Sequence, residues 1–304
     1  MALRPKPSAR WSLSTFDDSI LLGMRRAVRG APAARTPAAA SGRRGRWAWA
    51  GALAGALLAG VAFAPAAWLA QAVASASGDR LLLAEAQGSF WQGSALPVLA
   101  GGPGSQDAAV LPSRLDWSVR PFLGGLRLSL AQDCCIEPGL TLEWRPGWGG
   151  MSLRVVPAAG GVGHWPAAWL EGLGAPWNTL RPGGRLNLRT DGLELRAQGG
   201  AWSLAGQAEL DWLQASSRLS TLESLGSYRI TLSAPAEGGS AAAPQLGLQT
   251  LDGALQLSGS GQWGPRGLRF RGQAQAAPGF EPALNNLLNI IGRRAGAASV
   301  ISIG

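Results

Sequence analysis

Residues 202–212 read Trp-Ser-Leu-Ala-Gly-Gln-Ala-Glu-Leu-Asp-Trp, and from Trp202 to Trp212 every second residue is apolar or glycine. The residues between them are mostly polar, among them Glu209 and Asp211. A period of two is that of a β-strand, whose successive side chains point to opposite faces. One face of this strand is therefore expected to pack on a core while the other meets water, which is typical of antiparallel sheets.

The same alternation recurs along the chain in both directions from this stretch. Asp191-Gly192 and Asp252-Gly253 are turn dipeptides that separate such runs. Short helices are expected over 166–173, 221–225 and 282–291. We therefore predict a mainly β chain, with a mostly antiparallel, curved, extended sheet and two or three short helices. The further strands are predicted at 115–119, 126–130, 140–144, 151–155, 186–188, 193–195, 228–232, 255–257, 268–270 and 299–303.

A long uncharged segment precedes the alternating region. Residues 47–78 contain no charged side chain, and the basic run 43–46 comes directly before them. About 20 apolar residues are needed to span the core of a bilayer as a helix. We therefore predict a single transmembrane helix over 47–73. A cleaved signal peptide is the rival interpretation, but the apolar part of such a peptide is only about 7–15 residues long.

The charge of the chain is concentrated ahead of this segment. Residues 1–46 hold ten of the 27 basic residues and two of the 18 acidic ones, so they carry +8 of the net charge of +9. The positive-inside rule places such a tail in the cytoplasm. We predict a largely disordered cytoplasmic tail over 1–46 and a periplasmic β domain over 79–304, with the span in the inner membrane. The β domain is close to neutral, so no nucleic-acid partner is expected.

Residues that carry chemistry are scarce in this chain. His164 is the single histidine, so no cluster of metal ligands is expected. Cys134 and Cys135 are adjacent, about 3.8 Å apart at Cα, whereas disulfides join Cα atoms 4.4–6.8 Å apart. Two interpretations stay open: free thiols on opposite strand faces, or a bond from one cysteine to another chain. No nucleophile elbow, phosphate loop or dinucleotide fingerprint occurs. We expect no catalytic, metal or cofactor site, and therefore no enzyme.

Four short motifs resemble, in the same order, those of the type II secretion system protein N family. Residues 88–95 read Gly-Ser-Phe-Trp-Gln-Gly-Ser-Ala, and residues 115–121 read Leu-Asp-Trp-Ser-Val-Arg-Pro. Residues 225–228 read Leu-Gly-Ser-Tyr, and residues 287–294 read Leu-Leu-Asn-Ile-Ile-Gly-Arg-Arg. The motif positions are expected to be structural or to form an interface; they are Gly88, Trp91, Gly93, Trp117, Pro121, Gly226, Tyr228 and Gly292.

The resemblance implies an inner-membrane component of the machine that exports folded proteins through the outer membrane. It implies partners among the other inner-membrane and periplasmic components of that machine, and no catalytic residue is carried over from it. We expect Trp91 and Trp117 to fill a core, because large aromatic residues at alternating positions usually do so. Gly88 and Gly93 are expected to provide the backbone conformation that a turn or bulge requires.

An alternative function follows from the same apolar pattern. A long sheet with a face lined by Leu and Trp also resembles the AsmA-like group of envelope proteins, which are associated with lipid traffic. In this alternative the chain is a periplasmic protein that binds or transports lipid.

Overall fold

The computed structural model describes residues 43–158, 161–234, 243–264 and 267–304. It divides into two compact units, residues 1–58 and residues 59–304, which are taken separately here. The predicted basic tail, except for its last four residues, lies outside the described residues. In the first unit the described part is the larger portion of α1 (Arg43–Ala62), whose Trp47, Trp49 and Leu58 are all exposed.

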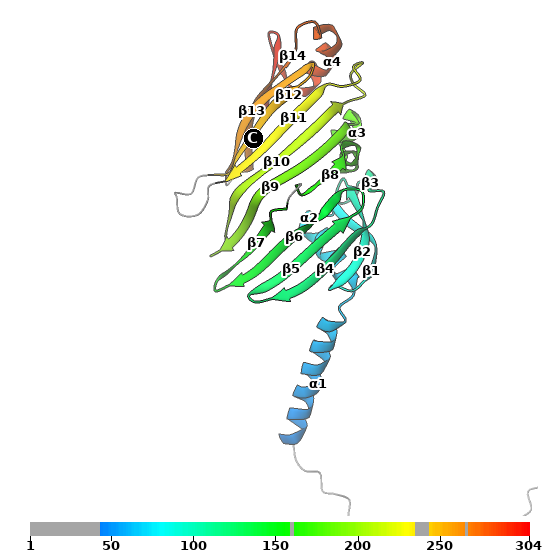
Figure 1. Cartoon of the computed structure of the whole chain (residues 1–304), viewed down its shortest axis with the longest axis vertical. Helices are drawn as coiled ribbons and strands as arrows, with labels where there is room; N and C mark the ends of the chain where they lie inside the picture. Colours follow the sequence, from blue (N-terminus) through cyan, green and yellow to red (C-terminus); the bar gives the residue numbers. More distant parts are fainter. Residues whose placement is uncertain (1–42, 159–160, 235–242, 265–266) are drawn as a thin grey trace, which may run out of the picture. The chain divides into compact units, whose positions relative to one another are not determined.

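The second unit is built on one 16-stranded antiparallel sheet (Figure 1). Its strands follow the order β1-β2-β4-β5-β6-β7-β9-β10-β11-β12-β13-β14-β16-β15, while β3 pairs with β2 and β8 pairs with β9. This confirms the prediction of a mainly β, antiparallel, open sheet with few helices. The strands are β1 (Leu81–Gly88), β2 (Gln92–Ala100), β3 (Ala108–Val110), β4 (Leu115–Phe122), β5 (Gly125–Gln132), β6 (Ile136–Gly147), β7 (Gly150–Val156), β8 (Gly163–Pro166), β9 (Gly183–Gln198), β10 (Ala201–Ser216), β11 (Gly226–Ala234), β12 (Gln245–Asp252), β13 (Leu255–Gly264), β14 (Gly267–Ala276), β15 (Arg293–Ala295) and β16 (Ala298–Ile303).

Cross-strand pairing keeps the two faces of the sheet chemically distinct. Leu128 pairs with Leu142, and Leu142 pairs with Val155, so one face carries apolar rows across the strands. The neighbouring positions give polar rows on the opposite face, beginning with Arg127 opposite Glu143. The period of two therefore produces an apolar face and a polar face over most of the sheet.

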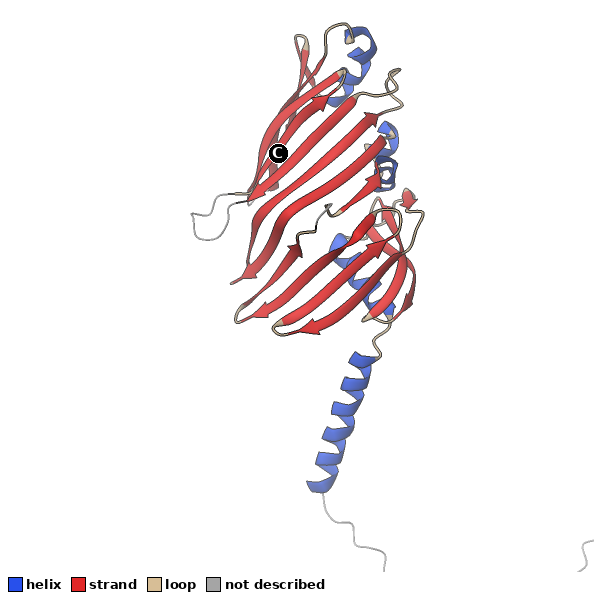
Figure 2. Ribbon diagram, in the orientation of Figure 1, coloured by secondary structure: helices blue, strands red, loops and turns tan. Residues whose placement is uncertain are grey.

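Four short helices accompany the sheet (Figure 2). They are α2 (Ala66–Ser77), the 3₁₀ helix η2 (Ala167–Leu173), α3 (Trp177–Leu180) and α4 (Glu281–Ile291). The helices predicted over 166–173 and 282–291 are confirmed as η2 and α4. The helix predicted over 221–225 is wrong, because the backbone N–H groups there bond elsewhere. Leu222 donates to the Ser220 hydroxyl, and Leu225 donates to the carbonyl of Ala215.

Two clusters of buried apolar residues lie at the two ends of the sheet. At one end Ala66 of α2 packs with Ala95, Trp117 and Val119. At the other end α4 covers β13 and β14. Between the two clusters, some side chains on the apolar face stay exposed, among them Trp144 at 36% and Trp202 at 62%. The α4 cluster consists of Leu225, Ala254, Leu255, Ala274, Leu284, Leu287 and Leu288.

The predicted transmembrane helix over 47–73 is not supported. Residues 63–65 interrupt it: α1 ends at Ala62, α2 begins at Ala66, and Pro65 between them is extended, with φ −71° and ψ 150°. Proline cannot donate the helical hydrogen bond, and its ring disfavours helix in the residue before it. Alanine and glycine also fill more than half of α1. Across the described residues, no helix combines the length and the apolar character needed to cross a membrane.

The turn predicted at Asp191-Gly192 is also wrong. Both residues lie inside β9, where Gly192 pairs with Gln207 and Thr190 pairs with Ala208. Asp191 is therefore the extra residue of a β-bulge, which bends the strand without ending it. The corresponding prediction at Asp252-Gly253 is confirmed, because these residues lie where β12 gives way to β13.

Candidate functional site

The first two motifs meet at the α2 end of the sheet. Gly93 pairs with Gly88 on β1 and with Trp117 on β4. A Cβ atom on Gly93 would lie 2.5 Å from the Trp117 ring, and one on Gly88 would lie 2.5 Å from the Gln92 carbonyl oxygen. Only glycine at position 93 therefore leaves room for the Trp117 ring. The indole N–H of Trp117, which is 3% exposed, donates to the Phe90 carbonyl at 3.2 Å.

Trp91 has a different structural role from Trp117. Its indole N–H donates to the carbonyl oxygen of Val61 at 2.8 Å, and its ring meets Phe90 edge to face at 5.3 Å between centroids. The backbone N–H of Phe90 donates to Ala64 at 2.8 Å. Trp91 is half-buried: it packs against the buried cluster of Trp117 and Val119, and it also ties the segment ahead of α2 to the sheet.

The later motif residues lie at the α4 end and do not join the first group. The Tyr228 hydroxyl donates to the Leu255 carbonyl at 2.9 Å, and burial raises the pKa of Tyr228. Gly226 has φ +142°, and a Cβ there would lie 2.3 Å from the Asp252 carbonyl oxygen. Gly292 has extended backbone, and a Cβ there would lie 2.6 Å from the carbonyl oxygen of Val300. The eight motif positions therefore form no single pocket.

The polar face of the sheet carries three carboxylates, each held between two arginines. Glu143 accepts hydrogen bonds from Arg127 at 2.7 Å and from Arg145 at 2.9 Å. Its side chain is only 10% exposed. We call this arrangement of one carboxylate between two guanidinium groups a clamp.

The same arrangement recurs twice further along the sheet. Glu194 accepts a hydrogen bond from Arg196 at 2.9 Å and lies 3.3 Å from Arg154. Asp211 accepts hydrogen bonds from Arg189 at 2.6 Å and from Arg229 at 2.7 Å. The second clamp joins β7 to β9, and the third joins β9, β10 and β11.

The clamps hold their carboxyl groups in the ionised form. Hydrogen bonds from Arg127 and then Arg145 lower the pKa of Glu143 below its ordinary value. The pKa of Glu194 is lowered chiefly by the hydrogen bond from Arg196. For Asp211 the main cause of the lowered pKa is the hydrogen bond from Arg229. The first two clamps hold two arginines to one carboxylate, whereas in the third Glu209 also lies 3.6 Å from Arg189 and 3.8 Å from Arg229.

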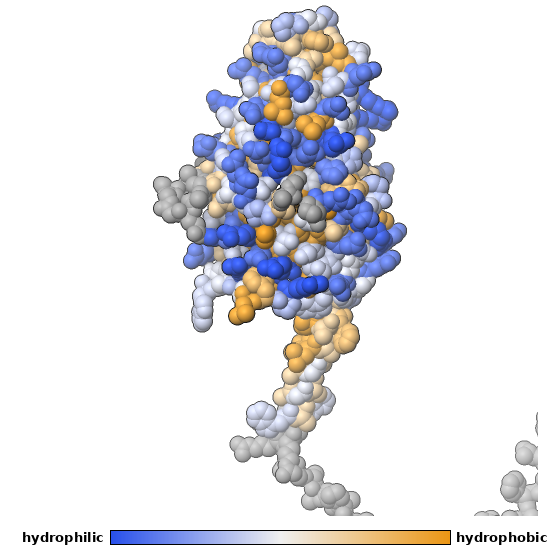
Figure 3. Space-filling model, in the orientation of Figure 1, coloured by the Kyte–Doolittle hydropathy of each residue, from blue (hydrophilic) through white to orange (hydrophobic). Residues whose placement is uncertain are grey.

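The polar face as a whole has more arginine than carboxylate. Figure 3 shows hydrophilic side chains spread over the side of the sheet that faces the viewer. Cross-strand register places more arginines than carboxylates of the described residues on the polar face. The arginines include Arg120, Arg127, Arg145, Arg154, Arg185, Arg189, Arg196, Arg229, Arg269, Arg271 and Arg293, and the carboxylates include Asp116, Glu143, Glu194, Glu209, Asp211 and Asp252.

Two adjoining hollows open on this face over β4, β5 and β6. They have volumes of about 750 Å³ and 680 Å³, and both are lined by Ser118, Ser129 and Thr141. These three hydroxyl residues are direct cross-strand neighbours. Arg120, Pro121, Phe122, Arg127 and Glu143 line the second hollow, and the motif residues Gly88, Gly93 and Trp117 line the first.

A family comparison bears on this architecture. The model of "Type II secretion system (T2SS), protein N" matches residues 79–301. The chain belongs to the type II secretion system protein N family. The match begins just before β1 and ends within β16, so it covers nearly the entire sheet. It confirms the resemblance drawn from the four motifs, and it connects the chain with type II secretion and protein transport. No curated protein and no solved structure that was compared with the chain matches it.

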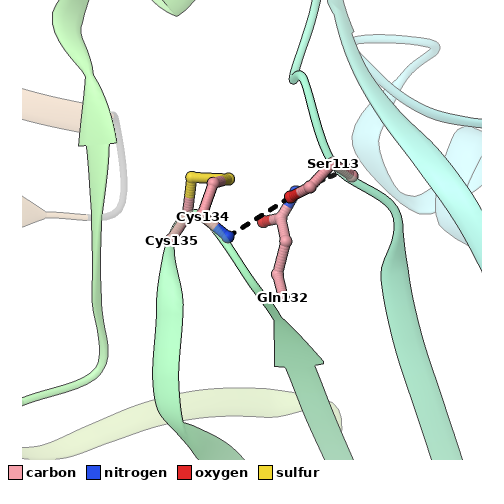
Figure 4. The surroundings of a disulfide bond; sticks show 4 residues. All are labelled: Ser113, Gln132, Cys134 and Cys135. Atoms are coloured by element: carbon pink, nitrogen blue, oxygen red, sulfur yellow. Dashed lines mark hydrogen bonds between the residues drawn. A yellow bond between two sulfur atoms is a disulfide. The ribbon is translucent and has the colours of Figure 1, made fainter.

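In this member of the protein N family the two cysteines form a disulfide with each other. Their Cα atoms are 3.7 Å apart, so the prediction that excluded a mutual bond is wrong. The pair lies in the turn between β5 and β6, where chain reversal brings adjacent side chains together. Gln132 holds the turn, because its side chain donates to the Ser113 carbonyl at 2.9 Å (Figure 4). The backbone N–H of His164 also donates to the Cys135 carbonyl.

No metal-binding group of three His, Cys, Asp or Glu side chains exists among the residues that the structure describes. His164 lies on β8 opposite Asn187. The residues that sequence reasoning missed are those of the clamps, which it placed on a solvated face as separate charges. The sequence does hold one signal for the clamps. Residues two apart on a strand share a face, so Glu143 with Arg145, and Glu194 with Arg196, could be predicted to form ion pairs.

Proposed function

We propose that this protein is a non-enzymatic interaction component of the type II secretion apparatus. It acts in assembly or export through contacts with the inner-membrane and periplasmic components of that machine. One observation carries the proposal: the domain is a single sheet with a large charged face and helices that pack on its ends. A single layer with an uncovered face has the area that a stable protein interface needs, about 800 Å² on each partner.

The edges of the sheet support the same proposal. The outer edge of β1 is unpaired among the described strands, and β1 has eight residues with one charge, Glu85. At the opposite edge β15 has only three residues, two of which are Arg293 and Arg294. Charged, short edge strands discourage pairing with another chain, whereas an apolar edge offers its backbone groups as a template. Docking of a partner strand is therefore expected at β1.

We further propose that the sheet lies in the periplasm and that the chain works at the inner membrane. The basic tail supports this location, because clustered arginines are attracted to the anionic cytoplasmic leaflet. Protease treatment of spheroplasts tests it: the sheet should be digested while the tail stays protected. Digestion of the tail alone would contradict the proposed topology.

The interaction role is tested by cross-linking the full chain in its own cells and purifying it. We expect other secretion components to be enriched, in amounts that fall when Leu83→Pro removes an outward-facing backbone donor from β1. Leu251→Pro at the exposed end of β12 serves as the control for general loss of structure. Enrichment of no secretion component would contradict the proposed function.

The half-exposed middle of the apolar face favours a second candidate function, lipid binding. Leu153 and Trp202 are 39% and 62% exposed there. A photoreactive residue in place of Leu153 should form a lipid adduct in cells, whereas one in place of Arg154, on the opposite face, should not. Equal labelling at both positions, or none at Leu153, would contradict lipid binding.

A further inference from the structure

We propose that the polar face over β4–β9 is a docking site for an extended acidic segment of a partner protein. The segment would place its carboxylates against Arg120 and the clamp arginines, and its backbone against the hydroxyls of Ser118, Ser129 and Thr141. This inference rests on the proposed function, in that the occupant is a protein, and it adds the site and the chemistry of that partner.

The argument begins with two arginines that face each other. Arg120 on β4 pairs directly with Arg127 on β5, and like charges in such a position destabilise a sheet. Arg127 is compensated by Glu143, but Arg120 is exposed and makes no ion pair with any described residue. An added carboxylate beside Arg120 would therefore remove a repulsion as well as form an ion pair.

From Arg127 onward, a row of paired side chains crosses the sheet, and their charges alternate in sign. Arg127 pairs with Glu143, Glu143 with Arg154, and Arg154 with Glu194. Arg145 and Arg196 lie two residues beyond the two glutamates on the same face. The two glutamates are buried to about nine-tenths between arginines that are 35–57% exposed, so the charge that reaches solvent is positive.

These arginines are already ordered for binding. Arg127 and Arg145 are held by Glu143, and each guanidinium also lies 5.3 Å from the centre of the Phe122 ring. A guanidinium held in place loses less side-chain entropy when it binds a carboxylate in the two-pronged manner that arginine prefers. The hollows beside them supply the space, about 750 Å³ and 680 Å³, and a row of hydroxyl donors.

Charge complementarity selects the occupant. The chain's own tail is excluded because it carries +8. A second copy using the same face would bring like charges together. A flat membrane surface cannot enter hollows in a sheet, whereas an extended polypeptide fits them. An acidic peptide segment is the occupant that satisfies both the charge and the shape.

The test uses the full chain and a fluorescent peptide of alternating Glu and Ser, with an alternating Lys and Ser peptide and vesicles of 30% phosphatidylglycerol as rival ligands. Anisotropy at low salt should show binding of the acidic peptide alone. Arg120→Glu should weaken that binding at least tenfold. Arg269→Glu, on the same face of β14, should change it less than twofold.

Failure of the acidic peptide to bind, preference for the vesicles, or equal loss with Arg269→Glu would overturn the proposal. Circular dichroism and thermal melting confirm that each variant is folded, and Arg120→Gln gives a milder second test. Failure of this test can be told apart from failure of the proposed function, because Arg120→Glu should not affect cross-linking to secretion components through β1.

Discussion

Gly93 lies opposite Trp117 in the pairing of β2 with β4, and a methyl group on Gly93 would reach to 2.5 Å from the Trp117 ring. Gly93→Ala should therefore lower the free energy of unfolding by roughly 1–3 kcal/mol, since either the ring or the strand must move. Thermal melting measures the effect. Gly264→Ala, where an added Cβ meets nothing within 4 Å, is the matched control and should change the melting temperature little.

Trp91→Phe should loosen the segment ahead of α2. The substitution removes the indole N–H that donates to Val61 but keeps an aromatic ring beside Phe90. A hydrogen bond of this kind contributes about 1 kcal/mol. Hydrogen exchange of residues 61–66 should accelerate, while exchange at β13 and β14 stays unchanged. Trp263→Phe, at an exposed site, is the control, and equal acceleration in both variants would contradict the assigned role.

Tyr228→Phe should destabilise the α4 end of the sheet by about 1–3 kcal/mol, because the buried carbonyl of Leu255 loses its hydroxyl donor. The ring contact with Trp212 remains, so the native fold should be kept. Chemical denaturation monitored by tryptophan fluorescence measures the loss. A variant as stable as the wild type would show that this hydrogen bond contributes nothing.

Acidification should weaken the clamps. The pKa values of Glu143, Glu194 and Asp211 are lowered in the folded chain, so the unfolded chain takes up protons first as the pH falls. Their stabilisation is present above the unfolded values of about 4 and is lost below them. Melting temperature should therefore drop between about pH 5 and pH 3.

The variant Glu194→Gln with Asp211→Asn should be less stable at pH 7 and should show a shallower drop on acidification. Glu223→Gln, at an exposed site that makes no ion pair with the described residues, should leave the profile unchanged. A profile of equal steepness in the double variant would mean that other groups control acid unfolding.

The disulfide bond between Cys134 and Cys135 should be detectable by mass spectrometry after alkylation. Denatured, unreduced protein should take up no alkylating reagent, and reduction should expose two sites. Alkylation of two sites before reduction would restore the interpretation of free thiols that the spacing of Cα atoms favoured.

Much of the sheet could be predicted from the sequence, because the period of two assigns side chains to faces without any knowledge of pairing. The same pattern says nothing of register. The row Arg127–Glu143–Arg154–Glu194 arises only when four strands align, and the last pairing crosses a 26-residue excursion between Val156 and Gly183. Two strong local patterns led to wrong predictions. Asp191-Gly192 forms a bulge inside a strand instead of a turn. The apolar run after Trp47 is divided into two helices, because Pro65 precedes a new helix that packs on the sheet.

The order of the strands also determines how the domain would respond to load. Nearly every strand pairs with its neighbours in sequence, and β1 and β15 lie at opposite edges. A pull between these edges runs along the interstrand hydrogen bonds, which are perpendicular to the strands, so the bonds open one row at a time. Such a sheet yields by peeling away single hairpins at its margins, so the domain would unfold gradually under tension.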